Sequence, residues 1–311
     1  MNATSAPLAL DTTVFARRLR TLQGPPLHDV NLDVLPGEIF VVVGRTGSSK
    51  STLLESLVGL RRVEAEDLVV CGCDPRAMPA EVRQRIGVAP QRASLERKVR
   101  VDEALALFRS FYERTVDPEQ LLEDLHLTSF RRWTTDRLPP SAAQRFSLAL
   151  ALVNDPVVLF ADEPTRDLDP EETRRVWDLL RDRRRRGRTV VMTSDRLEEA
   201  ERLADRVAVL ERGRLLVAET PAALLARSDR KVLVTFDLAR PAIDMDVLGR
   251  LDAAVSAVRE GDVYSIWSTD GFATTRALIR MLDALAARPR TLQLRYPNLE
   301  DVYFTLTAGA A

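Results

Sequence analysis

The sequence is poor in the side chains that build metal centres and histidine-based active sites. It contains only 2 cysteines and 2 histidines among 311 residues, and aromatic residues account for 5% of the chain. Cys71 and Cys73 could supply only two of the four ligands that zinc normally takes, so we interpret them as reduced thiols on one strand of a cytosolic protein. The composition therefore gives little support for a zinc site.

Long apolar runs and an excess of one charge are missing as well. The longest apolar runs, such as residues 157–160, are far shorter than the roughly 20 residues of a membrane-spanning helix. The 45 Lys and Arg residues nearly balance the 46 Asp and Glu residues, so we expect no nucleic-acid partner. We interpret the basic run at residues 181–188 as a solvated helix end, with nucleic-acid binding as the minor alternative because no aromatic platform accompanies it. Residues 1–7 lack the pattern of a secretory signal.

A glycine-rich turn between a buried strand and a helix is the strongest motif present. The apolar run at residues 39–43 predicts the strand, and residues 51–57 predict an amphipathic helix. This context is typical of a phosphate-binding loop, whose residues would be Gly44, Arg45, Thr46, Gly47, Ser48, Ser49, Lys50, Ser51 and Thr52. Lys50 would reach the terminal phosphates, and the Ser51 hydroxyl would hold Mg²⁺. A chance Gly/Ser-rich turn is the alternative.

One position of this loop departs from the usual pattern. Glycine is expected where the chain has Ser49. A Cβ there would crowd the phosphate, and a backbone with positive φ would cost about 1–2 kcal/mol.

A second buried strand ends in two adjacent carboxylates. Residues 157–160 are apolar, and Asp162 and Glu163 follow at the edge where parallel sheets bind ligands. Asp162 would hold Mg²⁺, and Glu163 would polarise the attacking water. A simple helix cap is the alternative for this acidic turn.

The rest of the chain predicts an α/β core with one insertion and one added domain. Residues 8–35 alternate in polarity and predict an antiparallel β element, whereas residues 98–153 predict a helical insertion, with Asp117 as a helix N-cap and a capping box beginning at Ser141. Residues 221–230 mark a boundary, and the β-α-β-β-α-β order beyond it predicts a small ferredoxin-like domain. We therefore expect a domain at residues 1–228 and an α+β accessory domain at residues 229–311.

The order of these motifs resembles the ATP-binding subunits of ABC transporters. The phosphate loop is followed by Gln91, the helical insertion, the Asp-Glu-Pro-Thr turn and Leu168-Asp169-Pro170. Residues 197–207 resemble the segment after the switch histidine of the family, and residues 297–303 resemble the ending of daunorubicin-resistance-type subunits, which serve type-2 exporters. The resemblance implies a P-loop NTPase (RecA-like) core that binds ATP and Mg²⁺. It also implies that Gln91 senses the nucleotide, ligates Mg²⁺ and contacts the membrane partner, and that Asp169 faces a second subunit.

Three family motifs are altered in this chain. The signature that would face the γ-phosphate of the opposite subunit falls on Leu138, Pro139, Pro140, Ser141 and Ala142, and its prolines have no N–H to donate. The switch position holds Asp195, which we expect to turn away from phosphate or to pair with Arg196, because two like charges at 4 Å repel by roughly 4 kcal/mol at an effective dielectric of 20. For the aromatic residue that stacks on adenine in the family, Phe15 is a candidate, whereas the aligned stretch, Arg20 to Leu22, contains no aromatic residue.

These features predict a nucleotide-binding subunit of an ABC exporter, peripheral to the cytoplasmic face of the membrane. Its partners would be a separate transmembrane permease and a second ATP-binding subunit, a paralogue with consensus motifs. We expect the chain to be the degenerate half of this pair, to hydrolyse ATP weakly, and to drive export of a drug-like, lipid or other small molecule. A non-transport ABC ATPase and a pseudo-ATPase regulatory subunit are the alternatives.

Overall fold

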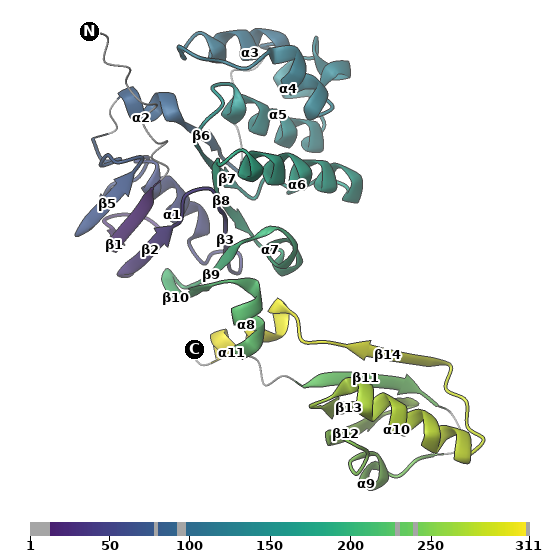
Figure 1. Ribbon diagram of the computed structural model, residues 1–311. Coiled ribbons are helices and arrows are strands. Elements are labelled where there is room, and N and C mark those ends of the chain that lie inside the picture. The colour runs from purple at the N-terminus through teal and green to yellow at the C-terminus, as the bar shows by residue number, and fades with distance from the viewer. Residues whose placement is uncertain (1–12, 78–79, 92–97, 228–230, 239–241, 309–311) are drawn as a thin grey trace, which may run out of the picture. The chain divides into compact units, whose positions relative to one another are not determined.

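The computed structural model describes residues 13–77, 80–91, 98–227, 231–238 and 242–308 (Figure 1). The chain divides into two compact units, Met1–Pro221 and Ala222–Ala311. The sequence placed the division at residue 228 and interpreted residues 221–227 as part of a boundary. The observed division falls within that region, and its first residues form the helix α8 (Pro221–Arg227), because they include a run of helix formers after a proline that is tolerated in a first turn.

A six-stranded sheet forms the centre of the first unit. Its strand order is β10-β9-β3-β8-β7-β6, and only the β10–β9 pair is antiparallel. The strands are β3 (Ile39–Val43), β6 (Ile86–Ala89), β7 (Val158–Asp162), β8 (Thr189–Ser194), β9 (Arg206–Glu211) and β10 (Arg214–Glu219). Every residue of β3, β7 and β8 is buried, as their apolar composition predicts.

Helices cover this sheet, and its parallel strands end along one edge. Helix α1 (Lys50–Leu57) packs against β7 and β8, α6 (Pro170–Arg185) against β8 and β3, and α7 (Leu197–Leu203) against the same two strands. Because β3, β6, β7 and β8 run parallel, the residues that follow them lie along one edge of the sheet.

A second, antiparallel sheet belongs to the same unit. Strand β1 (Val14–Thr21) pairs with β2 (Val30–Val34), β4 (Val63–Glu64) and β5 (Asp67–Val70). The alternation expected from residues 8–35 is visible in β2, in which buried and exposed side chains alternate. A short helix, α2 (Ala80–Arg85), precedes β6.

The insertion between β6 and β7 is helical, as the sequence predicts. It contains α3 (Val101–Arg109), α4 (Pro118–Asp124) and α5 (Pro140–Leu152), with 3₁₀ turns at Thr128–Phe130 and Thr135–Arg137. Asp117 is the N-cap of α4 and accepts a hydrogen bond from the Glu119 N–H at 3.1 Å. The capping box at Ser141 is wrong, because α5 already begins at Pro140 with Pro139 as N-cap. Proline is tolerated there because first-turn N–H groups have no partner within the helix.

The second unit contains one antiparallel sheet of four strands in the order β12-β13-β11-β14. After α8 its elements are β11 (Val232–Asp237), α9 (Met245–Leu248), β12 (Ala254–Glu260), β13 (Val263–Ser268), α10 (Gly271–Ala284), β14 (Thr291–Arg295) and α11 (Leu299–Ala308). The rings of Phe236 and Tyr264 stack at 4.8 Å in a core that includes Leu278 of α10. Among the described residues of both units, no helix is both long and apolar enough to cross a membrane.

Candidate phosphate-binding site

The predicted phosphate loop forms the turn between β3 and α1. A Cβ at Gly44 would lie 2.3 Å from the carbonyl oxygen of Leu210, so only glycine fits that position. Gly47 and Ser49 both have positive φ, 86° and 76° respectively. The left-handed backbone considered for Ser49 is therefore present, and this residue carries the strain that a glycine would avoid.

Lys50 folds back over this loop. Its side chain is only 5% exposed, and Nζ donates hydrogen bonds to the carbonyl oxygens of Gly44 at 2.7 Å and Arg45 at 3.3 Å. The Ser48 hydroxyl is buried and has no hydrogen-bond partner among the residues that the structure describes. A buried polar group without a partner is costly, and an anion in the loop would satisfy it.

The acidic turn after β7 is held by the neighbouring strand. The Thr193 hydroxyl of β8 donates to Asp162 and accepts from the Glu163 N–H at 3.0 Å. The Gln144 side chain donates to the Glu163 carbonyl oxygen at 3.1 Å, and Glu163 has a φ of 48°. The helix-cap alternative is wrong for these two carboxylates, since the N-cap of α6 is Asp169.

The Glu163 carboxylate lies at the centre of a group of four side chains. Its Oε2 accepts hydrogen bonds from Gln91 Nε2 at 2.6 Å and Arg166 Nη1 at 2.7 Å. Its Oε1 lies 3.7 Å from Lys50 Nζ. The fold thus brings together three residues that the sequence singled out and adds Arg166, which sequence reasoning missed although it is the only cation in the Asp-Glu-Pro-Thr-Arg turn.

The residues predicted to hold Mg²⁺ share one cavity. Ser51, Gln91 and Asp162 line a space of about 250 Å³ between α1 and the ends of β6 and β7. A hydroxyl, an amide oxygen and a carboxylate are the oxygen ligands that Mg²⁺ prefers, so the lining fits this ion.

A buried carboxylate that the sequence analysis did not consider connects two turns of the site. Glu199 of α7 is 1% exposed and accepts hydrogen bonds from Ser194 Oγ at 2.6 Å, Thr165 Oγ1 at 2.7 Å and Trp177 Nε1 at 2.7 Å. Glu199 thus joins the turn after β7 to the end of β8.

Asp195 directly follows the last residue of β8 and is exposed. Within the described chain no ion pair joins it to Arg196, contrary to one of our two expectations.

The signature-equivalent segment lies at the start of α5. Pro139 and Pro140 are exposed, and the Ser141 hydroxyl donates to Glu172 Oε1 at 3.4 Å. Asp169 forms a capping box with the same glutamate and accepts from its N–H at 2.8 Å. Phe15 is half-buried, and the Arg17 guanidinium lies 4.4 Å from the centre of its ring.

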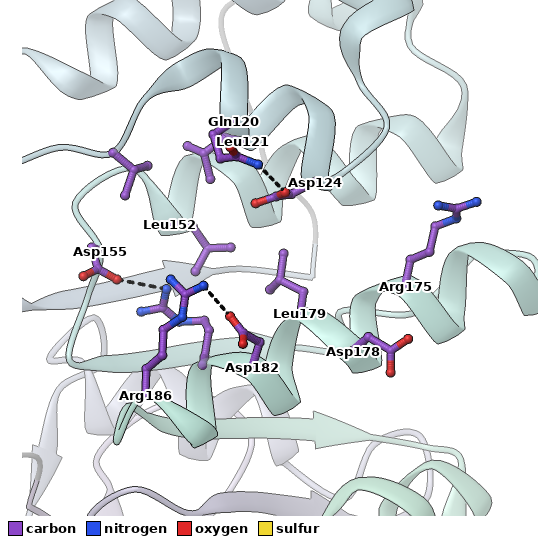
Figure 2. Close-up of a pocket in the computed structure, with 12 residues that line it drawn as sticks. Gln120, Leu121, Asp124, Leu152, Asp155, Arg175, Asp178, Leu179, Asp182 and Arg186 are labelled. Carbon is purple, nitrogen blue, oxygen red and sulfur yellow. Dashed lines mark hydrogen bonds and ion pairs between the residues drawn. The ribbon is translucent and has the colours of Figure 1, made fainter.

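A larger cavity of about 730 Å³ lies between α4, α5 and α6 (Figure 2). Four of its charged side chains form two ion pairs: Arg183 Nη1 with Asp155 Oδ1 at 3.2 Å, and Arg186 Nη2 with Asp182 Oδ2 at 2.7 Å. The Arg183 side chain is 12% exposed and burial lowers the pKa of its guanidinium, so the solvated-face interpretation is wrong for this residue. None of the predicted site residues lines this cavity.

Comparisons with known proteins agree with this geometry. A family model described as ABC transporter matches residues 27–166. The chain is 34% identical over 292 residues to the Nod factor export ATP-binding protein I of Paraburkholderia xenovorans (strain LB400), covering 89% of this chain and 90% of that protein. It is 33% identical over 253 residues to a fluoroquinolones export ATP-binding protein of Mycobacterium tuberculosis (strain CDC 1551 / Oshkosh), covering 79% and 84% respectively.

Solved structures match the fold at lower identity. The structure of an ATP-binding subunit of an ABC transporter gives a TM-score of 0.63 at 21% identity, over 70% of this chain and 93% of that one. A dimeric ATP-binding cassette in a post-hydrolysis state, bound to ADP and Pi, gives a TM-score of 0.59 at 23% identity, over 67% and 98%.

Proposed function

The chain belongs to the ABC transporter family of ATP-binding proteins, and from that premise we propose that it is the nucleotide-binding subunit of an exporter. The observation that carries the proposal is the convergence of Lys50, Gln91 and Glu163 at the sheet edge, where a hydrogen bond from Gln91 and an ion pair with Lys50 connect Glu163 to the end of β6 and to the turn before α1. Three separate segments of the chain supply these side chains, which makes a chance Gly/Ser-rich turn a poor explanation.

ATP would bind with its phosphates in the turn before α1. The free N–H groups of the turn and of the first helical residues would bind the phosphate oxygens, and Lys50 would exchange its two carbonyl partners for phosphate. Ser51, Gln91 and Asp162 would hold Mg²⁺, which when bound neutralises negative charge on the phosphates. Glu163 would accept a hydrogen bond from the attacking water.

The export role is inferred from the relatives named above. We propose that the chain is peripheral to the cytoplasmic face of the membrane and drives a separate permease that exports a drug-like, lipid or other small molecule. Gln91 and α3 would contact that permease, because Leu107 and Phe111 at the end of α3 remain 52% and 59% exposed. Residues 92–97, which follow Gln91 and begin and end with Arg92 and Arg97, lie outside the described residues.

We also propose that the chain is the degenerate half of an asymmetric pair. Pro139 and Pro140 leave the start of α5 without the N–H groups of a consensus signature, and Asp195 places a carboxylate where a donor is expected. A partner subunit with consensus motifs would supply a complete signature to Lys50 and Glu163 of this chain. Asp195 is exposed and forms no ion pair within the described part of the chain, which also supports the second candidate, a pseudo-ATPase that binds ATP only to regulate a transporter.

For residues 229–311 we propose a ferredoxin-like accessory domain. The support is the β-α-β-β-α-β order of β11 to β14 together with the sheet order β12-β13-β11-β14, in which the first and third strands are central.

ATP affinity provides the test of the nucleotide site. Lys50→Ala should weaken binding of ATP and Mg²⁺ by about 10- to 100-fold, since a hydrogen bond to a charged group contributes about 1.5–3 kcal/mol. Lys231→Ala, an exposed lysine of the second unit, is the matched control and should leave the affinity unchanged. Equal affinities of the native chain and Lys50→Ala would refute the site.

Purification of the native complex from membranes tests the transport role. We expect the chain to co-purify with an integral membrane protein and with a second ATP-binding subunit. Attachment to ribosomal proteins or DNA instead would favour a non-transport ABC ATPase and would contradict the exporter proposal.

A further inference from the structure

Among the described residues, Arg166 is the cation closest to the Glu163 carboxylate. Its Nη1 lies 2.7 Å from Oε2, and its side chain is 45% exposed, whereas that of Glu163 is 10% exposed. We propose that Arg166 is a positioning residue for ATP hydrolysis: it holds Oε2 of Glu163 and directs Oε1 toward the phosphates bound near Lys50. This inference rests on the proposed nucleotide site.

The two other partners of Glu163 have separate tasks once ATP is bound. Lys50 would turn to the phosphates, and Gln91 would turn to Mg²⁺. Arg166 has no such competing ligand in the proposed site. Its place is set by the local turn, in which the Arg166 N–H donates to the Glu163 carbonyl oxygen at 3.0 Å. The ion pair therefore persists when the other two contacts are exchanged.

Electrostatics give Arg166 a role that an ordinary surface pair lacks. Glu163 is almost fully buried, and a buried carboxylate is stable as an ion only with a partner. Binding of ATP would withdraw Lys50 and bring negative phosphates close to the carboxylate, which would repel it. Asp195 adds a carboxylate rather than a cation to this region of the chain, so Arg166 would supply the positive charge that holds the Glu163 carboxylate in place.

The carboxylate oxygen of Glu163 that Arg166 contacts shows whether the arginine positions the carboxylate or blocks it. Gln91 and Arg166 both donate to Oε2, and among the described residues no hydrogen bond reaches Oε1. Oε1 instead lies on the side of Lys50, at 3.7 Å from Nζ. An arginine that blocked the carboxylate would occupy this free oxygen. The observed arrangement leaves it available to the attacking water, as expected for a base that is oriented by a third group.

Single-turnover hydrolysis by the full-length chain tests the inference. The chain, in excess over γ-labelled ATP with Mg²⁺, is compared with Arg166→Ala and Arg166→Lys. The matched control is Arg181→Ala, which removes another half-exposed arginine that pairs with a carboxylate three residues away. We expect Arg166→Ala to lower the rate constant at saturating chain by about 10- to 100-fold, with the ATP affinity changed by less than about 3-fold. Arg166→Lys and added guanidinium ion should each restore part of the rate, and Arg181→Ala should have no effect.

A double variant separates positioning from a general loss of structure. In a Glu163→Gln background, Arg166→Ala should cause no further loss of rate, because both changes remove the same charged pair. An unchanged or faster rate for Arg166→Ala, an additional loss in the Glu163→Gln background, or native hydrolysis no faster than the uncatalysed background would each overturn the proposal. The proposed function fails separately, if ATP affinity does not depend on Lys50.

Discussion

The strain at Ser49 predicts a measurable gain in stability when glycine replaces serine. Ser49 has φ 76° and ψ 24°, and its side chain makes no capping hydrogen bond to α1. Removing the strain of a left-handed backbone conformation raises the free energy of unfolding by about 1–2 kcal/mol per residue. The greater freedom of glycine in the unfolded chain costs about 0.4–1 kcal/mol. The net increase in the free energy of unfolding should therefore be about 0.5–1 kcal/mol for Ser49→Gly, or about 2 °C in the melting temperature of a unit of this size.

ATP affinity gives a second, independent result for the same variant. Strain that is present in both the free and the bound chain does not change affinity, whereas removal of the Cβ from the phosphate loop does. We expect Ser49→Gly to tighten ATP binding, by up to about tenfold if the Cβ interferes by about 1.4 kcal/mol.

Thermal unfolding without nucleotide and equilibrium ATP titration are the two assays. Ser110→Gly is the matched control, because Ser110 caps α3 in a right-handed conformation with φ −67° and its hydroxyl donates to the Leu107 carbonyl oxygen at 2.6 Å. The control should lose stability. A melting temperature of Ser49→Gly below that of the native chain would refute the strain argument, and weaker ATP binding would refute the crowding argument.

Two further predictions concern hydrolysis and pH. The native chain alone should hydrolyse ATP slowly, because the loss of one oriented donor typically costs about 2.7–4 kcal/mol. Consensus residues in the signature should raise the rate little by themselves, but substantially together with Asp195→His. Brisk hydrolysis by the native chain that Glu163→Gln abolishes would contradict this prediction. Burial raises the pKa of Glu38 above its ordinary value, although Leu35 N–H and Arg206 partly offset it. The native state therefore favours the protonated carboxyl, and the stability that this preference provides is lost as pH rises from the ordinary pKa through the raised one. Urea unfolding at several pH values should show Glu38→Gln gaining stability relative to the native chain across that window, and a pH-independent difference would contradict it.

Local sequence signals predicted the parts of the site that depend on the backbone. An apolar β-branched run followed by glycines and Lys50 was enough to place the turn between β3 and α1, because a buried strand, its turn and the next helix are adjacent in the chain. Parallel pairing then places Asp162 and Gln91 at the same edge of the sheet. The mixed α/β fold of an ABC ATP-binding subunit is confirmed by the solved structures.

One error arose where two local signals compete. Ser141 has the pattern of a capping box, but Pro139 and Pro140 before it are also suited to a helix start, and the helix begins with the prolines. Residues 221–227 belong to the predicted boundary region, in which the two units do divide, and they form α8 because Ala222 to Ala226 are helix-forming residues.

Side-chain partners that come from distant segments could not be predicted from the sequence. Glu199 joins Thr165 and Ser194 only because α7 packs against β8, so its carboxylate lies beside two turns at once. The pair of Arg166 and Glu163 was within reach of a local argument, since a turn brings residues three apart together. The motif itself, however, indicates only a carboxylate for the attacking water, and the cation that balances its charge is not part of that motif.

The altered positions differ in what they change, and this difference decides which step of the ATP cycle should suffer. Ser49 keeps the left-handed backbone of the loop, and Lys50 remains buried with its amine at the loop carbonyls, so the phosphate site retains its donors. Glu163 also has positive φ, 48°, and is held by Thr193 and Gln144 at its backbone. Such strain persists only where the surroundings over-determine the conformation, which indicates a rigid frame on this side of the site. In the proposed assignment of the signature and the switch, Pro139, Pro140 and Asp195 would remove donors or reverse charge in segments outside the turn between β3 and α1. We therefore expect ATP binding to survive in this chain and hydrolysis to depend on what a second subunit contributes.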